Sequence, residues 1–213
     1  MKKQFITVLL LFIAVIVDSQ TAKDLFSPSN VKISWLGVDF SHVKLIGDFS
    51  QFYGAGEKDN AQIRDNYFPA WNRLILVEPD KYDIKGMLRN DSIIYDIEMV
   101  TKINSSTPNN DMESYNTPNY SKKDIETFVS LYDTKEKSGI GILFLAESLN
   151  KSMKEAYYHF VAIDMKTKEI LFHERLRGKP KGFGLRNYWA GSIYSVIKEI
   201  KNERYKVWIN QSN

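Results

Sequence analysis

The sequence predicts an α+β domain in which helices pack against a single mixed, largely antiparallel sheet, preceded by a cleavable signal peptide. Three observations lead to this fold class. Strand-like segments alternate with segments whose apolar residues recur at helical spacing, two strand segments near the C-terminus are separated by a short turn, and the chain opens with an apolar run. Residues 20–213 suffice for one hydrophobic core, so we expect a single domain after the signal peptide.

Residues 1–19 have the layout of a secretory signal peptide. Two lysines follow the initiator methionine, residues 5–17 are apolar apart from one threonine, and small residues come next. We place the cleavage after Ser19, with Thr21-Ala22 as the second choice. The apolar run is shorter than the roughly 20 residues that span a bilayer. The mature chain is therefore expected in the periplasm or outside the cell without stable membrane insertion, and an uncleaved N-terminal anchor is the alternative.

Composition argues against two classes of protein. The chain has no cysteine, so it forms no disulfide and lacks the residue to which a bacterial lipoprotein attaches its lipid. With 29 basic and 26 acidic residues the formal net charge is +3, without the concentrated positive charge of a nucleic-acid-binding surface. We therefore expect no nucleic acid partner.

The N-terminal half begins with a strand segment followed by a helix. Residues 31–46 are rich in Val, Ile, Phe and Trp and predict a long strand or strand pair, bent near Gly37. Residues 57–77 predict a helix, which Pro69 should kink or divide. Apolar residues at spacings of four, four and three define the face that this helix turns to the core: Ile63, Tyr67, Trp71 and Leu74.

The middle of the chain is less regular. A short helical piece is expected at residues 82–88 and a second strand at residues 92–103. Residues 104–120 are dominated by Asn, Ser, Thr and Pro, which predicts a polar loop that is disordered or a passive surface segment, or alternatively a lid or binding loop. Ser121 then caps a helix, with Asp124 as its capping-box partner.

The C-terminal half supplies three strands and a helix. Residues 139–146 are almost continuously apolar, which predicts a central strand covered on both faces. Residues 156–164 and 169–177 predict the two strands of an antiparallel hairpin. The last helix is expected to run from about Asn187, as its cap, to Glu203.

This C-terminal region resembles a known group of proteins. The hairpin FVAIDMKTKEILFHERLRGK, followed by a glycine-rich loop and YWAGSIYSVIKEI, is similar to the strand-turn-strand-helix unit of exported bacterial envelope proteins of the curli-secretion and penicillin-binding-protein-activator type. The resemblance covers about the last quarter of the chain and implies a non-catalytic interaction domain of the periplasm. The chain departs from that group because it lacks the lipid-bearing cysteine.

The histidines are the candidate catalytic residues. His42 follows Asp39 too closely for the two side chains to converge on a regular strand, since residues three apart point to opposite faces. Pairing outwards from a four-residue turn places His159 opposite Glu174, and an imidazole beside a carboxylate is a possible acid–base pair. A purely structural cross-strand pair is the alternative, and a one-residue change in the turn would separate the two residues.

The glycine-rich loop RGKPKGFGLRNYW precedes the last helix. It does not match a dinucleotide fingerprint, because Asn187 replaces the third glycine, or a P-loop, because no Lys-Ser/Thr follows the final glycine. Three cations beside the helix start are candidates for binding an anion: Lys179, Lys181 and Arg186. The alternative is that the glycines only permit a tight backbone path.

Taken together, these patterns favour binding over catalysis. No metal-ligand spacing, calcium loop or nucleophile elbow is present, so no metal and no cofactor are expected. We expect an exported cell-envelope protein acting as a binding or assembly module, with an envelope protein or a glycan as its partner. The second hypothesis is a small periplasmic hydrolase that uses the pair His159 and Glu174.

Overall fold

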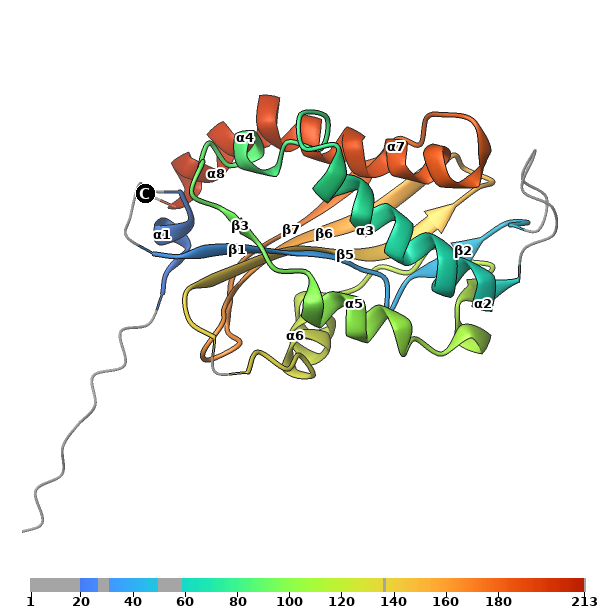
Figure 1. Ribbon diagram of the computed structural model, residues 1–213, viewed down its shortest axis with the longest axis horizontal. Helices are drawn as coiled ribbons and strands as arrows, with labels where there is room; N and C mark the ends of the chain where they lie inside the picture. Colours follow the sequence, from blue (N-terminus) through green and yellow to red (C-terminus); the bar gives the residue numbers. More distant parts are fainter. Residues whose placement is uncertain (1–19, 27–30, 50–58, 136, 213) are drawn as a thin grey trace, which may run out of the picture.

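The computed structural model describes residues 20–26, 31–49, 59–135 and 137–212, so the expected signal peptide lies outside the described residues. The fold is α+β, with one seven-stranded sheet between helices (Figure 1). The sheet is mixed, but four of its six strand pairs are parallel. The prediction of a largely antiparallel sheet was wrong, because the sequence revealed the direction of the hairpin strands alone.

Strand β5 (Ile140–Asn150) is the centre of the sheet, as its apolar sequence predicts. It pairs along its whole length with the antiparallel strand β6 (Glu155–Asp164). Its other side pairs in parallel first with β1 (Ile33–Asp39) and then with β2 (Lys44–Ile46). Every residue of β5 is buried, because helices cover both faces of the sheet.

The strands β1 and β2 are the predicted bent pair. The register of β1 against β5 shifts between Trp35 and Gly37, where Gly37 has φ +106°, a conformation that glycine adopts without strain. This confirms the predicted bend. Short parallel strands complete this side of the sheet, β3 (Ile94–Tyr95) on β1 and β4 (Glu113–Ser114) on β2. The opposite edge is β7 (Ile170–Gly178), which pairs with β6.

One face of the sheet carries a large aromatic core, here called the aromatic face. Its four tryptophans are fully buried: Trp35, Trp71, Trp189 and Trp208. The helices that cover it include α1 (Ala22–Phe26), α3 (Phe68–Val77), α4 (Ile84–Met87), α7 (Gly184–Glu199) and α8 (Tyr205–Ser212). In Figure 1, α4, α7 and α8 lie above the sheet. Many aromatic rings thus lie between these helices and the strands, together with aliphatic side chains.

Pro69 divides the predicted helix over residues 57–77. The helix starts as α2 (Asn60–Gln62), widens into a π-helical turn (Ile63–Tyr67) and continues as α3. Proline has no N–H to donate to the preceding turn, and a π-helical turn accommodates this loss. Of the predicted core face, Ile63, Trp71 and Leu74 are buried and Tyr67 is partly buried against the same core.

The opposite face is covered, within the described residues, by α5 (Glu98–Ser105) and α6 (Lys122–Ser130), and we call it the α5–α6 face (Figure 1). The strand predicted over residues 92–103 was wrong beyond β3, because a short apolar run fits a helix as well as a strand. The predicted capping box is confirmed: the Ser121 side chain accepts from the Asp124 N–H, and the Asp124 side chain accepts from the Ser121 N–H.

Two asparagine side chains complete the hydrogen bonding of β1 where β3 has ended. Asn72, on α3, accepts from the Val38 N–H at 2.7 Å and donates to the Val38 carbonyl at 2.9 Å. Asn104, on α5, accepts from the Phe40 N–H at 2.7 Å and donates to the same Val38 carbonyl at 2.9 Å. A side-chain amide carries the same donor and acceptor as a peptide group, so these residues take the place of a neighbouring strand.

The segment over residues 104–120 is more ordered than a plain polar loop. It contains a 3-10 turn (Asn109–Asp111) and strand β4, and Met112 is buried with 1% exposure. Thr107 is also buried, and the Thr117 hydroxyl accepts from the Asn150 side chain at 3.1 Å. The segment therefore belongs to the packed domain.

The last helix begins earlier than predicted. α7 starts at Gly184 with Phe183 as its cap residue, so the expectation that Asn187 caps it was wrong. Gly182 and Gly184 have φ +134° and +75°, which lets the chain turn directly into the helix. The glycines thus permit a tight backbone path, as the second interpretation of this loop predicted.

Candidate functional site

A buried carboxylate is the centre of a polar cluster on the α5–α6 face. Glu147 lies on β5 at a bulge, because the pairing with β6 skips from Ala146 to Ser148. Side chains alternate along the strand, and Leu143 and Leu145 face the same side as Glu147. The residue is fully buried, so its charge requires partners.

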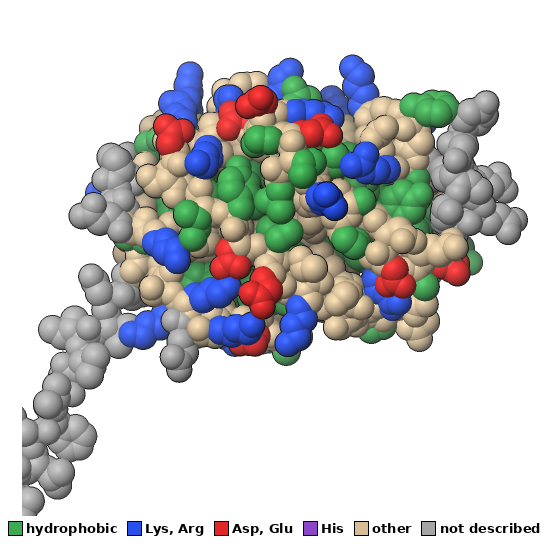
Figure 2. All heavy atoms as spheres, in the orientation of Figure 1, with side chains coloured by type: hydrophobic (Ala, Val, Ile, Leu, Met, Phe, Trp, Pro, Cys, Tyr) green, Lys and Arg blue, Asp and Glu red, His purple; other side chains and the backbone are tan. Residues whose placement is uncertain are grey.

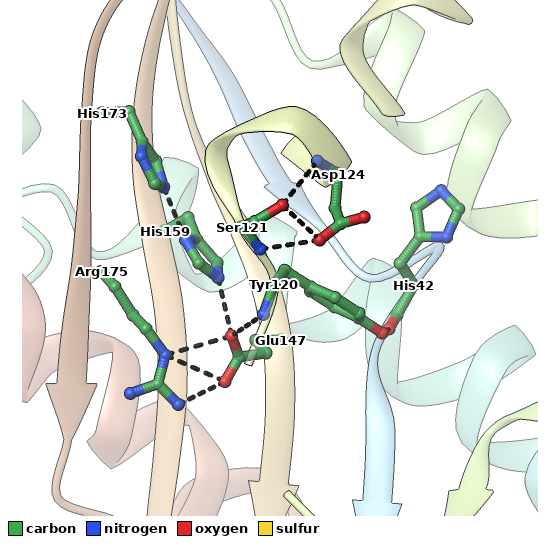
Figure 3. A network of polar contacts seen from close by, with 8 residues as sticks. All are labelled: His42, Tyr120, Ser121, Asp124, Glu147, His159, His173 and Arg175. Carbon is green, nitrogen blue, oxygen red and sulfur yellow. Dashed lines mark hydrogen bonds and ion pairs between the residues drawn. The ribbon is translucent and has the colours of Figure 1, made fainter. Parts of the chain in front are cut away.

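Three groups supply those partners (Figure 3). His159 Nε2, on β6, lies 2.9 Å from Glu147 Oε2, and the Tyr120 N–H donates to the same oxygen at 3.1 Å. The guanidinium of Arg175, on β7, donates from Nε to both carboxylate oxygens at 3.1 Å and from a terminal nitrogen to Oε1 at 2.5 Å. Such a fork is among the strongest ion-pair geometries.

The second nitrogen of His159 extends the cluster to a second imidazole. His159 Nδ1 lies 2.7 Å from His173 Nε2, and the rings stack at 4.9 Å between centroids. When His159 is neutral and donates from Nε2 to the carboxylate, its Nδ1 has a lone pair, so His173 must donate from Nε2. The carboxylate of Glu147 thereby orients the His159 ring, which in turn contacts His173.

The charges of the cluster follow from these contacts. Burial alone would raise the pKa of Glu147, but the hydrogen bonds from His159 and Arg175 outweigh it and lower that pKa. Burial, as the largest cause, lowers the pKa of His173 to about 4. At neutral pH the cluster therefore contains an ionised Glu147, a cationic Arg175 and a neutral His173.

The structure separates the predicted pair His159 and Glu174. The register shifts between Ala162 and Ile163, so His159 lies opposite Arg175 and Glu174 lies opposite Phe160 on the aromatic face. There the carboxylate of Glu174 accepts from the Trp208 indole and pairs with Arg204. The predicted pairing was wrong because the hairpin contains a bulge. Sequence reasoning missed Glu147, for which the one signal is a charged residue at the end of an apolar strand.

The cluster is closed to ligands. His159 and Glu147 are fully buried, and neither of them nor His173 lines any of the five main pockets found among the described residues. The described part of the chain also holds no set of three acidic, histidine or cysteine side chains placed to bind a metal ion. The arrangement suits a structural role, because its ion pair and hydrogen bonds link β5, β6 and β7.

A pocket of about 360 Å³ lies between α5 and α6, beside the carboxyl end of β1. Ligands of sheets with parallel strands commonly bind at the carboxyl ends of those strands. The apolar and aromatic side chains that line it include Met99, Ile103, Phe128, Leu131 and Tyr132. Leu131 is 72% exposed, which is unusual for a large apolar side chain next to a core.

Polar groups at this pocket are mostly paired. The Tyr132 hydroxyl donates to the buried Asp39 carboxylate at 2.5 Å, and Asp39 also accepts from the Ser41 N–H at 2.7 Å, as a turn aspartate would. The His42 ring stacks on Phe128 at 3.6 Å, and burial lowers its pKa, so the ring is neutral at neutral pH.

Three lysines line the pocket, and they differ in whether they form an ion pair. Lys135 pairs with Glu98 at 3.0 Å, and Lys137 pairs with Asp96 at 2.6 Å. For the Lys102 ammonium group the described residues provide no ion-pair partner. The walls are therefore apolar and the mouth is polar, which is the usual composition of a small-ligand site.

The candidate anion-binding cations lie apart from both sites. Lys179, Lys181 and Arg186 are all exposed. The backbone near them is engaged, because the Lys181 N–H donates to the Tyr188 carbonyl at 3.2 Å and Trp71 donates to the Arg186 carbonyl at 2.9 Å. The loop is thus fastened to α7 and α3, and anion binding there stays a prediction.

Comparisons with protein-family models, with curated proteins and with solved structures found no match for this chain. Within its described residues, none of the helices has the length and apolar character needed to cross a bilayer.

Proposed function

We propose that this chain is an exported, non-catalytic binding module of the cell envelope and that the α5–α6 pocket is its binding site. The observation that carries the proposal is the contrast between an open apolar pocket and a closed histidine cluster. The pocket exposes Leu131 to solvent, whereas the imidazole with the best carboxylate partner, His159, has 0% exposure. A binding site needs an open apolar pocket, whereas a hydrolase needs a base that the substrate can reach.

The hydrolase hypothesis has less support. Its carboxylate would have to be Glu147, which is already engaged by Arg175, His159 and Tyr120. His173 and Arg175 are partly exposed, but neither lines any of the main pockets found in the described residues. Chemistry at the cluster would require the sheet to open.

The surface supports a partner other than nucleic acid. Figure 2 shows basic and acidic side chains interspersed with hydrophobic ones on the face that carries α3 and α5. No large field of one sign is visible on that face, and the net charge of the whole chain is +3. A nucleic-acid-binding surface concentrates positive charge, so we expect a ligand that is recognised by an apolar group.

Fluorescence titration with 8-anilinonaphthalene-1-sulfonate tests the proposed site, because this probe joins an aromatic body to an anionic head. We expect saturable binding that weakens by about tenfold in Leu131→Glu, which places a charge at the apolar mouth. The matched control is Met153→Glu, since Met153 is 66% exposed and lies outside the pocket. Equal binding by the two variants would contradict the proposal.

A further inference from the structure

The first described residue is held by a buried carboxylate of the hairpin turn. The Gln20 N–H lies 3.2 Å from Asp164 Oδ2, across 144 residues of sequence. Asp164 is the last residue of β6 and is only 3% exposed. The N-terminal end of the described domain therefore lies against the turn between β6 and β7.

The other oxygen of Asp164 organises that turn. Oδ1 accepts from the Lys166 N–H at 2.8 Å and from the Thr167 N–H at 3.0 Å. Burial would raise the pKa of Asp164, but the N–H groups of Thr167, Gln20 and Lys166 lower it. The carboxylate is thus ionised at neutral pH and oriented, with Oδ2 directed at the nitrogen of Gln20.

The residues after Gln20 are fastened to the domain as well. The Thr21 hydroxyl donates to Asp24 at 2.7 Å, at the start of helix α1. Leu25 is 1% exposed, and Phe26 packs edge-on against Phe172 at 5.4 Å between ring centroids. The folded domain therefore uses the chain from Gln20 onward.

We propose that the mature chain begins at Gln20 and that its α-ammonium group forms an ion pair with Asp164. The proposal rests on the export in the proposed function. Hydrolysis of the bond after Ser19 leaves a carboxylate on Ser19 and an ammonium on Gln20. The nitrogen that now donates one N–H to Asp164 then carries a positive charge. Cleavage after Ala22, the second choice, removes Gln20 and Thr21 and takes this donor away from Asp164.

The first test is N-terminal sequencing and intact mass of the protein recovered from the producing cells. We expect a chain that begins with Gln20. A chain that begins with Lys23 would overturn this inference and leave export standing. A chain that retains Met1 would overturn both.

The second test is a double-mutant cycle on the purified domain. One partner is the terminal amine, either free on Gln20 or converted to an amide by a two-residue extension. The other is Asp164→Asn, which keeps an oxygen for the turn but removes the charge. We expect Asp164→Asn to lower the folding equilibrium constant about three- to tenfold more in the chain with the free amine. This difference should shrink in high salt.

Glu169→Gln, at an exposed site on the same turn, is the control. Equal effects of Asp164→Asn in both chains would overturn the ion pair while leaving the cleavage site intact.

Discussion

The two faces of the sheet bury their side chains in different ways. On the aromatic face, rings of Phe, Tyr and Trp pack against one another under several helices. On the α5–α6 face, a smaller aliphatic core lies beside a buried ionic cluster and an open pocket. The aromatic face has the larger buried core, so we expect it to supply more of the stability, whereas the other face carries the pocket proposed as the binding site.

The largest expected effect is on the aromatic face. The Phe144 ring lies 5.2 Å from Trp35 and 6.1 Å from Phe160, between ring centroids. We expect Phe144→Ala to lower the free energy of unfolding by about 3–5 kcal/mol in urea melts. Its neighbour Leu143 points to the opposite face, and Leu143→Ala should cost about 2–3 kcal/mol. If Leu143→Ala lost more unfolding free energy than Phe144→Ala, the α5–α6 face would be the more stabilising of the two.

The next effect tests the ionic cluster. Glu147→Gln keeps the shape of the side chain but leaves Arg175 without its counter-charge and His159 without a charged acceptor. We expect a loss of about 2–3 kcal/mol, since a buried pair is costly to break from one side. Glu126→Gln is the control, because Glu126 forms an exposed pair with Lys122 at 3.8 Å. Similar urea midpoints for the two variants would show that the cluster is solvated.

A smaller effect is expected on changing the pH. The pKa of His173 is about 4 in the folded protein, against an ordinary histidine value of 6.5, so the unfolded chain binds more protons between these values. Stability should therefore be complete above about pH 6.5 and fall as the pH drops towards 4. Because the ring is partly exposed, we expect a loss of about 1–2 kcal/mol.

Thermal melts across this window give the measurement. His173→Gln should flatten the profile. The pKa of His42 is lowered in the same direction, so His42→Gln, measured in parallel, gives the part of the profile that is due to His42. A profile that His173→Gln leaves unchanged would assign the pH dependence to other groups.

The smallest effect concerns the helix ends. Ser121→Ala should cost about 1 kcal/mol by removing the capping box of α6. Asn187→Ala should cost less than about 0.5 kcal/mol, because Asn187 lies exposed inside the first turn of α7 instead of capping it. Guanidinium melts can resolve this difference, and equal costs would show that Asn187 has a structural role that its position does not reveal.

Local sequence signals predicted several elements of the fold. The apolar run at residues 139–146 became β5, the spacing from Ile63 to Leu74 gave the buried side of α3, and Ser121 with Asp124 formed the capping box. Each of these signals acts over a few residues. The parallel pairing of β1 with β5 joins segments about half the chain apart, and no local pattern specifies which distant strands become neighbours.

The candidate site was harder to predict for the same reason. One bulge in the β6–β7 hairpin moved Glu174 to the opposite face from His159. Regular alternation along β5 puts Glu147 on the same face as Leu145, where it contacts His159 instead. A bulge changes the face of every later side chain. The α5–α6 pocket is formed by residues from separate helices and loops, so no contiguous motif marks it.

The amides of Asn72 and Asn104 have a consequence for self-association. The final residues of β1 would otherwise present unpaired N–H and C=O groups, to which a strand of another molecule could add. The two side chains already form hydrogen bonds with the N–H and C=O of Val38 and with the N–H of Phe40. Any incoming strand would first have to displace them, so this edge of the sheet is protected against intermolecular pairing of the kind that begins aggregation.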